Sequence, residues 1–98
     1  MLSVKLIREV LNRRDPQGFI KLGAPADEYD LEARLIFTMI EHSEHRLLTK
    51  EMIHRIVFDV FVETFGLMIA GDKQSYSDVA DDIYNHFMMK VGKRNGRN

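Results

Sequence analysis

The apolar residues between positions 53 and 65 recur with the spacing of an α-helix, and this pattern limits the fold more than any other feature of the chain. The residues at i, i+3, i+4, i+7, i+8 and i+12 are Ile53, Ile56, Val57, Val60, Phe61 and Phe65. This spacing places all six on one face, which is typical of a helix packed against a core. Thr49 is its expected N-cap. Because no useful stretch alternates with a period of two, the sequence predicts an all-α domain with this helix at its centre.

The end of the central helix has two interpretations. Gly66 followed by Leu67 is typical of a Schellman motif, in which a left-handed glycine ends the helix and the next apolar residue folds back. Alternatively, the helix continues to Gly71. Helix propensity does not decide between the two ends.

Two other helices are expected on either side of a long first loop. The first covers about residues 4–13, with Ser3 as N-cap. The second begins near Glu28, with Asp27 as N-cap, and ends near His42. Its main apolar stripe is Tyr29, Ala33, Ile36, Phe37 and Ile40, and a second set, Leu31, Leu35 and Met39, widens the stripe. We therefore expect the second helix to be buried on more than one side.

A fourth helix is predicted from Ser75, its N-cap, to Gly92, which closes it. The first loop starts at Asp15-Pro16-Gln17-Gly18, where the proline ends the first helix, and continues with apolar residues that favour packing over mobility. The prediction is a four-helix bundle-like single domain over residues 1–92, with a long ordered loop between the first two helices. A basic flexible tail is expected at 93–98.

The composition agrees with one small globular domain. The chain has 98 residues, of which 45% are apolar and 30% charged, so it can bury a core without disulfides or metal ions. It has no cysteine, which excludes disulfides, thiolate metal sites and a thiol nucleophile. No apolar run approaches the length of a membrane span, and no signal peptide is evident. We expect a cytoplasmic protein without membrane association.

Candidate catalytic and metal-binding residues are sparse. His42 and His45 could share a helix face with Glu41 as zinc ligands, but histidines at a helix end have an ordinary structural explanation. No phosphate-binding glycine motif and no nucleophile motif are present. We therefore expect a protein that is not an enzyme and that has no metal and no cofactor.

The formal charge of −1 is a cancellation between unlike segments. Residues 27–44 hold six acidic residues against Arg34, and residues 72–82 hold four against Lys73. Residues 1–14 and 90–98 are basic. An acidic face suits a basic protein partner, although acidic residues also serve helix starts. Direct nucleic-acid binding is not expected, because no aromatic-interleaved basic patch is present.

The turn Asp15-Pro16-Gln17-Gly18 and the later Asp27-Glu28-Tyr29-Asp30 together resemble the YugE-like small bacterial helical proteins over about residues 4–90. Gly66-Leu67 is also similar to that family. Two positions depart from its pattern, which often has Trp where this chain has Arg14 and an aliphatic residue where it has Gln17. The motif itself has a structural interpretation, in which Asp15, Pro16 and Gly18 shape the turn, Asp27 caps a helix and the Tyr29 hydroxyl finds a partner.

The resemblance implies a function in binding, because some similar proteins are immunity partners of contact-dependent growth-inhibition toxins. The partner would be a cognate toxin domain. The expected contact residues are the acidic side chains Glu28, Asp30, Glu32, Glu41 and Glu44, all assumed exposed. The alternative is a small helical regulatory or adaptor module, possibly a homodimer, with Met68, Ile69, Met88 and Met89 as its contact patch.

Overall fold

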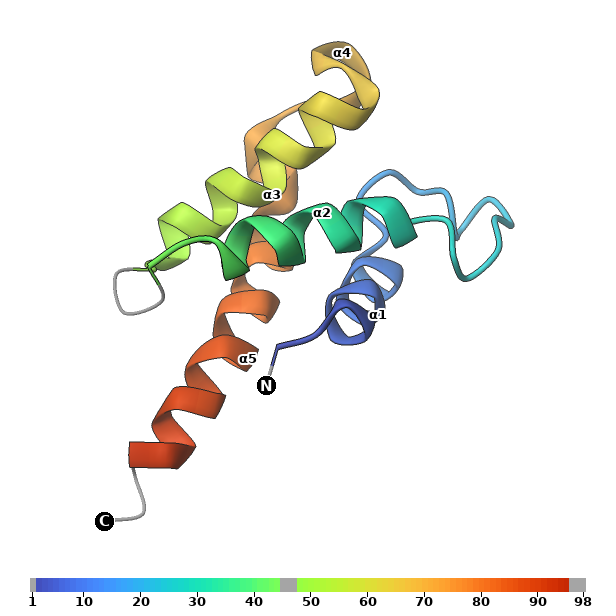
Figure 1. Cartoon of the computed structure of the whole chain (residues 1–98). Coiled ribbons are helices and arrows are strands. Elements are labelled where there is room, and N and C mark those ends of the chain that lie inside the picture. Colours follow the sequence, from blue (N-terminus) through green and yellow to red (C-terminus); the bar gives the residue numbers. More distant parts are fainter. Residues whose placement is uncertain (1, 45–47, 96–98) are drawn as a thin grey trace.

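Helices make up all the regular structure of the described chain (Figure 1). The structure, a computed structural model, describes residues 2–44 and 48–95, with side chains described up to Met89. The elements are α1 (Val4–Arg14), α2 (Asp30–Glu41), α3 (Lys50–Phe65), α4 (Leu67–Ala70), the 3₁₀ helix η2 (Lys73–Tyr76) and α5 (Ser77–Asn95). The predicted all-α class is confirmed, and the described residues contain no strand.

Helix α3 lies at the centre, as its periodicity predicted. It packs against α2, α4, η2 and α5, while α1 packs against α2 and α5. Four residues of its apolar face are buried, namely Ile53, Val57, Val60 and Phe61. Each large apolar side chain buried in this way contributes about 1.5–3 kcal/mol relative to an exposed one. The apolar face therefore favours the helical conformation of this segment and also supplies a large part of the core.

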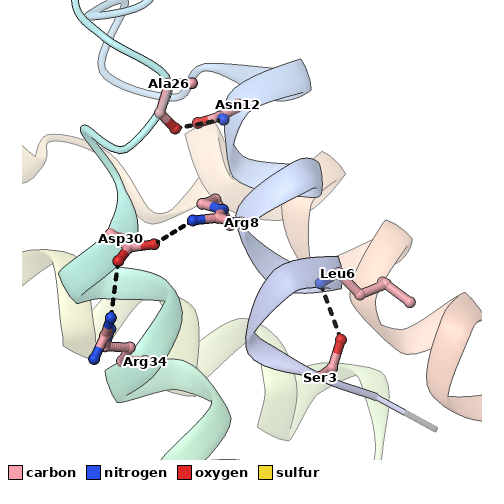
Figure 2. Close-up of polar contacts among 7 residues, drawn as sticks. All are labelled: Ser3, Leu6, Arg8, Asn12, Ala26, Asp30 and Arg34. Atoms are coloured by element: carbon pink, nitrogen blue, oxygen red, sulfur yellow. Dashed lines mark hydrogen bonds and ion pairs between the residues drawn. The ribbon is translucent and has the colours of Figure 1, made fainter.

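Two of the predicted N-caps are confirmed. The Ser3 hydroxyl accepts a hydrogen bond of 3.1 Å from the Leu6 amide (Figure 2), and the Thr49 hydroxyl accepts one of 3.2 Å from the Met52 amide. Both residues have extended backbone, as an N-cap requires. These caps satisfy amides that have no partner within the helix.

The predicted start of the second helix is wrong. Helix α2 begins at Asp30, its N-cap position is Tyr29, and no side chain caps it. The Asp27 carbonyl, rather than its carboxylate, accepts from the Asp30 amide at 3.0 Å. The reason is tertiary, because the buried Tyr29 is held by the first loop and fixes where the helix begins.

Both interpretations of the α3 end were partly wrong. Helix α3 stops at Phe65, and a separate helical turn, α4, follows Gly66. Gly66 has φ 83° and ψ 156°, which is a glycine-specific conformation but not the left-handed helical one of a Schellman motif. Leu67 does not fold back onto the helix, since it is largely exposed.

Helix α5 also departs from its predicted ends. Ser75 lies inside η2 and is not an N-cap, because the buried Tyr76 draws the preceding residues into a 3₁₀ turn that leads directly into α5. The helix then passes Gly92 without closing and extends to Asn95. The predicted flexible tail is therefore helical at 93–95, and residues 96–98 lie outside the described part.

The second apolar set of α2 is not buried as predicted. Leu31, Leu35 and Met39 are 56%, 37% and 42% exposed. The predicted main stripe does meet the core, since Tyr29, Ala33, Ile36 and Ile40 are buried and the half-buried Phe37 packs against them. Helix α2 thus buries one face and presents a second apolar stripe to solvent.

The described chain is elongated, with extents of 46 × 23 × 20 Å. Figure 1 shows α2 crossing α3, against which it packs, and the C-terminal part of α5 extending away from the other helices. No helix in the described ranges is both long and apolar enough to cross a membrane.

Candidate interaction surface

The half-buried Asp15–Gly18 turn and the buried Tyr29 form a polar cluster that explains the sequence motif. The Asp15 carboxylate accepts hydrogen bonds from the amides of Ile20 (3.0 Å) and Lys21 (2.9 Å) and from the Tyr29 hydroxyl (2.7 Å). Partial burial alone would raise the pKa of Asp15, but these three donors outweigh it and the pKa is lowered. Burial together with the Asp15 bond raises the pKa of Tyr29.

Gln17 joins this cluster to η2 and, through Tyr76, to α4. Its backbone amide donates to the Tyr29 hydroxyl at 3.0 Å, and its side-chain amide donates to the Tyr76 hydroxyl at 2.6 Å. Tyr76 in turn donates to the Ala70 carbonyl. The Gln17 side chain therefore makes a specific polar contact, and Asp15, Gln17 and Tyr29 hold the loop in place.

Aromatic contacts complete the ordering of the loop. The Phe19 ring stacks on Tyr29 with centroids 5.8 Å apart and meets Phe65 of α3 at 5.6 Å. Such pairs add stabilisation beyond the area they bury. The predicted ordered loop is confirmed.

Of the five predicted contact residues, Asp30 forms ion pairs with two arginines of this chain. Its carboxylate lies between Arg8 of α1, at 3.0 Å, and Arg34 of α2, at 3.2 Å (Figure 2). Figure 2 also shows Asn12 of α1 donating to the Ala26 carbonyl, at 2.8 Å. Asp30 therefore serves to join α1 to α2, and its charge is already balanced.

Glu32 was expected to be exposed and is not. It is 3% exposed, and its Oε1 has no hydrogen-bond partner among the described residues. Burial raises the pKa of Glu32, and the nearby charge of Glu28 raises it further. The helical period places Glu32 beside the apolar stripe of α2, so the sequence alone did not separate it from its exposed neighbours.

The remaining predicted residues, Glu28, Glu41 and Glu44, are exposed. Glu28 precedes the first turn of α2, whereas Glu41 and Glu44 lie at its other end, about 20 Å away along a helix axis. The structure therefore does not bring the five residues together into one acidic face.

The acidic residues of α5 are balanced by internal ion pairs. Asp82 accepts a forked pair from Arg14, with Nε at 2.8 Å and Nη2 at 3.1 Å, and a third bond from Arg13 at 3.2 Å. The bonds from Arg14 lower the pKa of Asp82. Asp78 lies 3.7 Å from Arg14, and Asp81 lies 3.3 Å from Lys50. The basic first helix is thus bound to the acidic last helix.

A groove of about 450 Å³ lies between α2 and α3, and sequence reasoning missed it. Its lining comprises Leu35 and Met39 of α2 and Asp59, Val60, Val62 and Glu63 of α3. Within the described ranges, neither Asp59 nor Glu63 forms an ion pair. The signal was present in the sequence, since the stripe of Leu31, Leu35 and Met39 is angularly distinct from that of Ile36 and Ile40.

The described histidines, His42, His54 and His86, do not belong to a group that could hold a metal ion. No three His, Asp or Glu side chains among the described residues are placed to share a metal ion. His42 is exposed, and His45 lies outside the described residues. His54 is engaged with the Lys73 carbonyl through Nε2 at 2.8 Å, which ties α3 to η2.

The fold and this surface describe a small all-α domain with an acidic, partly apolar groove. Comparison with protein-family models, curated proteins and solved structures gives no match to this chain.

Proposed function

We propose that this chain is a non-catalytic binding protein, an immunity protein that binds and neutralises a cognate bacterial toxin domain. The observation that supports this best is the groove between α2 and α3, where exposed apolar side chains lie beside carboxylates that form no ion pair with any described residue. Apolar area bordered by charged residues is typical of protein interfaces. The resemblance of the Asp15–Gly18 and Asp27–Asp30 motifs to YugE-like proteins supports the choice of a toxin as partner.

The proposed surface differs from the one expected from sequence. Glu28, Glu41 and Glu44 stay candidates because they are exposed, and Asp59 and Glu63 join them. Asp30 and Glu32 leave the set, because one is paired with two arginines and the other is buried. Exposed acidic groups steer a basic partner toward the surface and raise the rate of association.

The test is co-purification with the toxin domain encoded beside this gene. The expected result is a one-to-one complex whose affinity falls in Glu28→Lys and is unchanged in Glu9→Lys, which reverses an exposed charge on α1. The proposal fails if the two proteins purify separately, or if no adjacent reading frame encodes a secreted toxin.

A second function, a homodimeric adaptor, is favoured by the apolar turn α4. Leu67, Met68 and Ile69 are 65%, 95% and 61% exposed, and contiguous exposed apolar residues often mark contact sites. Met88 and Met89 are also exposed, but they lie on α5, away from α4 (Figure 1). Sedimentation equilibrium would support the adaptor if Met68→Ser converted a dimer into a monomer, and a monomeric wild type would exclude it.

A further inference from the structure

The groove between α2 and α3 combines three kinds of lining. One wall is the exposed side of α2, at Leu35 and Met39. Between the helices lie Val60, which is buried, and Val62, which is half-buried. The other wall carries the carboxylates of Asp59 and Glu63. A ligand in this groove meets apolar surface on one side and negative charge on the other.

The two carboxylates are regularly spaced. Asp59 and Glu63 are four residues apart on α3, so they stand one turn apart, about 6 Å along the helix axis. Within the described part of the chain they have no ion pair, whereas Asp30, Asp78, Asp81 and Asp82 all do. Internal cations thus balance those four aspartates, whereas Asp59 and Glu63 are available to an external cation.

The apolar wall continues beyond the groove. Leu31 lies one turn before Leu35 on α2 and is 56% exposed, so the apolar stripe from Leu31 to Met39 extends over two turns. A stripe of this length fits an extended apolar face better than a compact small molecule. Methionine at its end adapts to side chains of different shape.

The recurring modes of peptide recognition leave one that suits this surface. Strand addition needs a sheet edge, and the described residues contain no strand. Polyproline recognition needs an aromatic-lined groove, and phosphate recognition needs clustered arginines; the lining residues include neither. A helix in a groove needs apolar lining along a helical track, which α2 and α3 provide.

We propose that this groove binds an amphipathic α-helix of the partner protein, with apolar residues against Leu35, Met39 and Val62 and Lys or Arg residues one turn apart against Asp59 and Glu63. The proposal rests on the proposed function and names the partner element that this surface recognises. The basic row sets the register of the helix, because each cation has its best position opposite one carboxylate.

The test uses a model peptide of leucine, alanine and lysine of about 18 residues, or roughly five turns. Its leucines repeat at i, i+3, i+4 and i+7, and its lysines stand four apart beside them. Control peptides carry glutamate in place of lysine, or the same composition rearranged to a period of two. Binding is measured by fluorescence anisotropy, and its site is mapped by methyl NMR of Leu35, Met39, Val60 and Val62.

The expected result is saturable binding of the helical basic peptide, at least tenfold weaker in the double variant Asp59→Lys/Glu63→Lys and unchanged in Glu9→Lys. Circular dichroism establishes that each variant is folded. Met39→Ser, which leaves the carboxylates in place, should also weaken binding. Equal binding of the rearranged peptide would overturn the proposal, as would methyl shifts confined to α4, or a self-associated dimer that Asp59→Lys/Glu63→Lys dissolves.

This outcome is separable from that of the proposed function. A toxin complex that forms normally with Asp59→Lys/Glu63→Lys would overturn the groove assignment and leave the immunity function standing. Peptide binding at the groove without any toxin complex would support the groove assignment and overturn the immunity function.

Discussion

At the scale of single residues, Asp15 determines the conformation of the first loop. It is the one described residue other than glycine with a positive φ, 49°, a conformation that aspartate tolerates better than most residues. Its carboxylate accepts from two loop amides and from Tyr29. The Asp-Pro-x-Gly turn could be predicted from sequence, but the link to Tyr29 depends on a contact 14 residues away that no local pattern reveals.

Tyr29→Phe removes the hydroxyl that donates to Asp15 and accepts from the Gln17 amide. We expect a loss of about 1–3 kcal/mol in the free energy of unfolding, because a partly buried carboxylate oxygen and a loop amide both lose a partner. Urea denaturation measures the change. Tyr84→Phe is the control, since Tyr84 is half-buried without a hydrogen bond in the described structure, and equal losses in the two variants would contradict the role of the Tyr29 hydroxyl.

Glu32 gives a pH dependence of the opposite sign to that of Asp15. Burial raises its pKa, so the folded chain binds this proton more tightly than the unfolded chain. Its contribution to stability is therefore most favourable below the ordinary glutamate pKa of about 4.3 and declines as pH rises toward the raised value. The lowered pKa of Asp15 acts in the other direction, and its stabilisation is lost as pH falls.

We expect Glu32→Gln to be at least as stable as the wild type at pH 7. In the wild type a carboxylate is buried, and one of its oxygens has no partner in the described structure. An uncharged amide of the same size costs less to bury. The variant should also lose the part of the stability decline that begins near pH 4. Denaturant unfolding from pH 4 to pH 7 tests this, with the exposed Glu9→Gln as control. A variant clearly less stable than the wild type at pH 7 would contradict it.

At the scale of elements, the sequence predicted the middles of the helices well and their ends poorly. Ser3 and Thr49 cap as predicted because their local backbone suffices for a cap. Asp27 and Ser75 do not act as N-caps. The neighbouring buried tyrosines, Tyr29 and Tyr76, fix the backbone there through hydrogen bonds to residues farther along the chain. A cap motif is a local signal, and long-range packing overrides it.

Gly66 separates α3 from α4 through a backbone conformation that only glycine adopts easily. An alanine Cβ there would meet no atom within 4 Å, so the penalty is conformational rather than steric contact with a neighbour. We expect Gly66→Ala to lower the free energy of unfolding by about 1–3 kcal/mol. Gly92→Ala, within α5, should be neutral or stabilising by up to about 1 kcal/mol. Thermal denaturation compares them, and equal effects would argue against a special role for Gly66.

At the scale of the whole molecule, the near-neutral net charge does not reveal which acidic groups are ion-paired. In the described chain Asp82 has an internal ion pair, whereas Asp59 has none. Arg14 and Asp82 are 68 residues apart in sequence, so the pairing that neutralises α5 could not be predicted from charge counts along the chain. Among the predicted acidic contact residues, Asp30 is likewise ion-paired within the chain, and Glu32 is buried. Asp59 and Glu63 lie in α3, whose apolar periodicity predicts the buried face of the helix. That periodicity does not indicate which exposed residues of the helix line a groove.

The central claim is that this chain neutralises a toxin by binding it through the surface of α2 and α3. The most direct measurement is the survival of cells that express the adjacent toxin domain together with this chain. Wild type and Glu9→Lys should restore growth, whereas the folded triple variant Glu28→Lys/Asp59→Lys/Glu63→Lys should not. Toxin-induced death that is equal with and without the wild-type chain would contradict the claim.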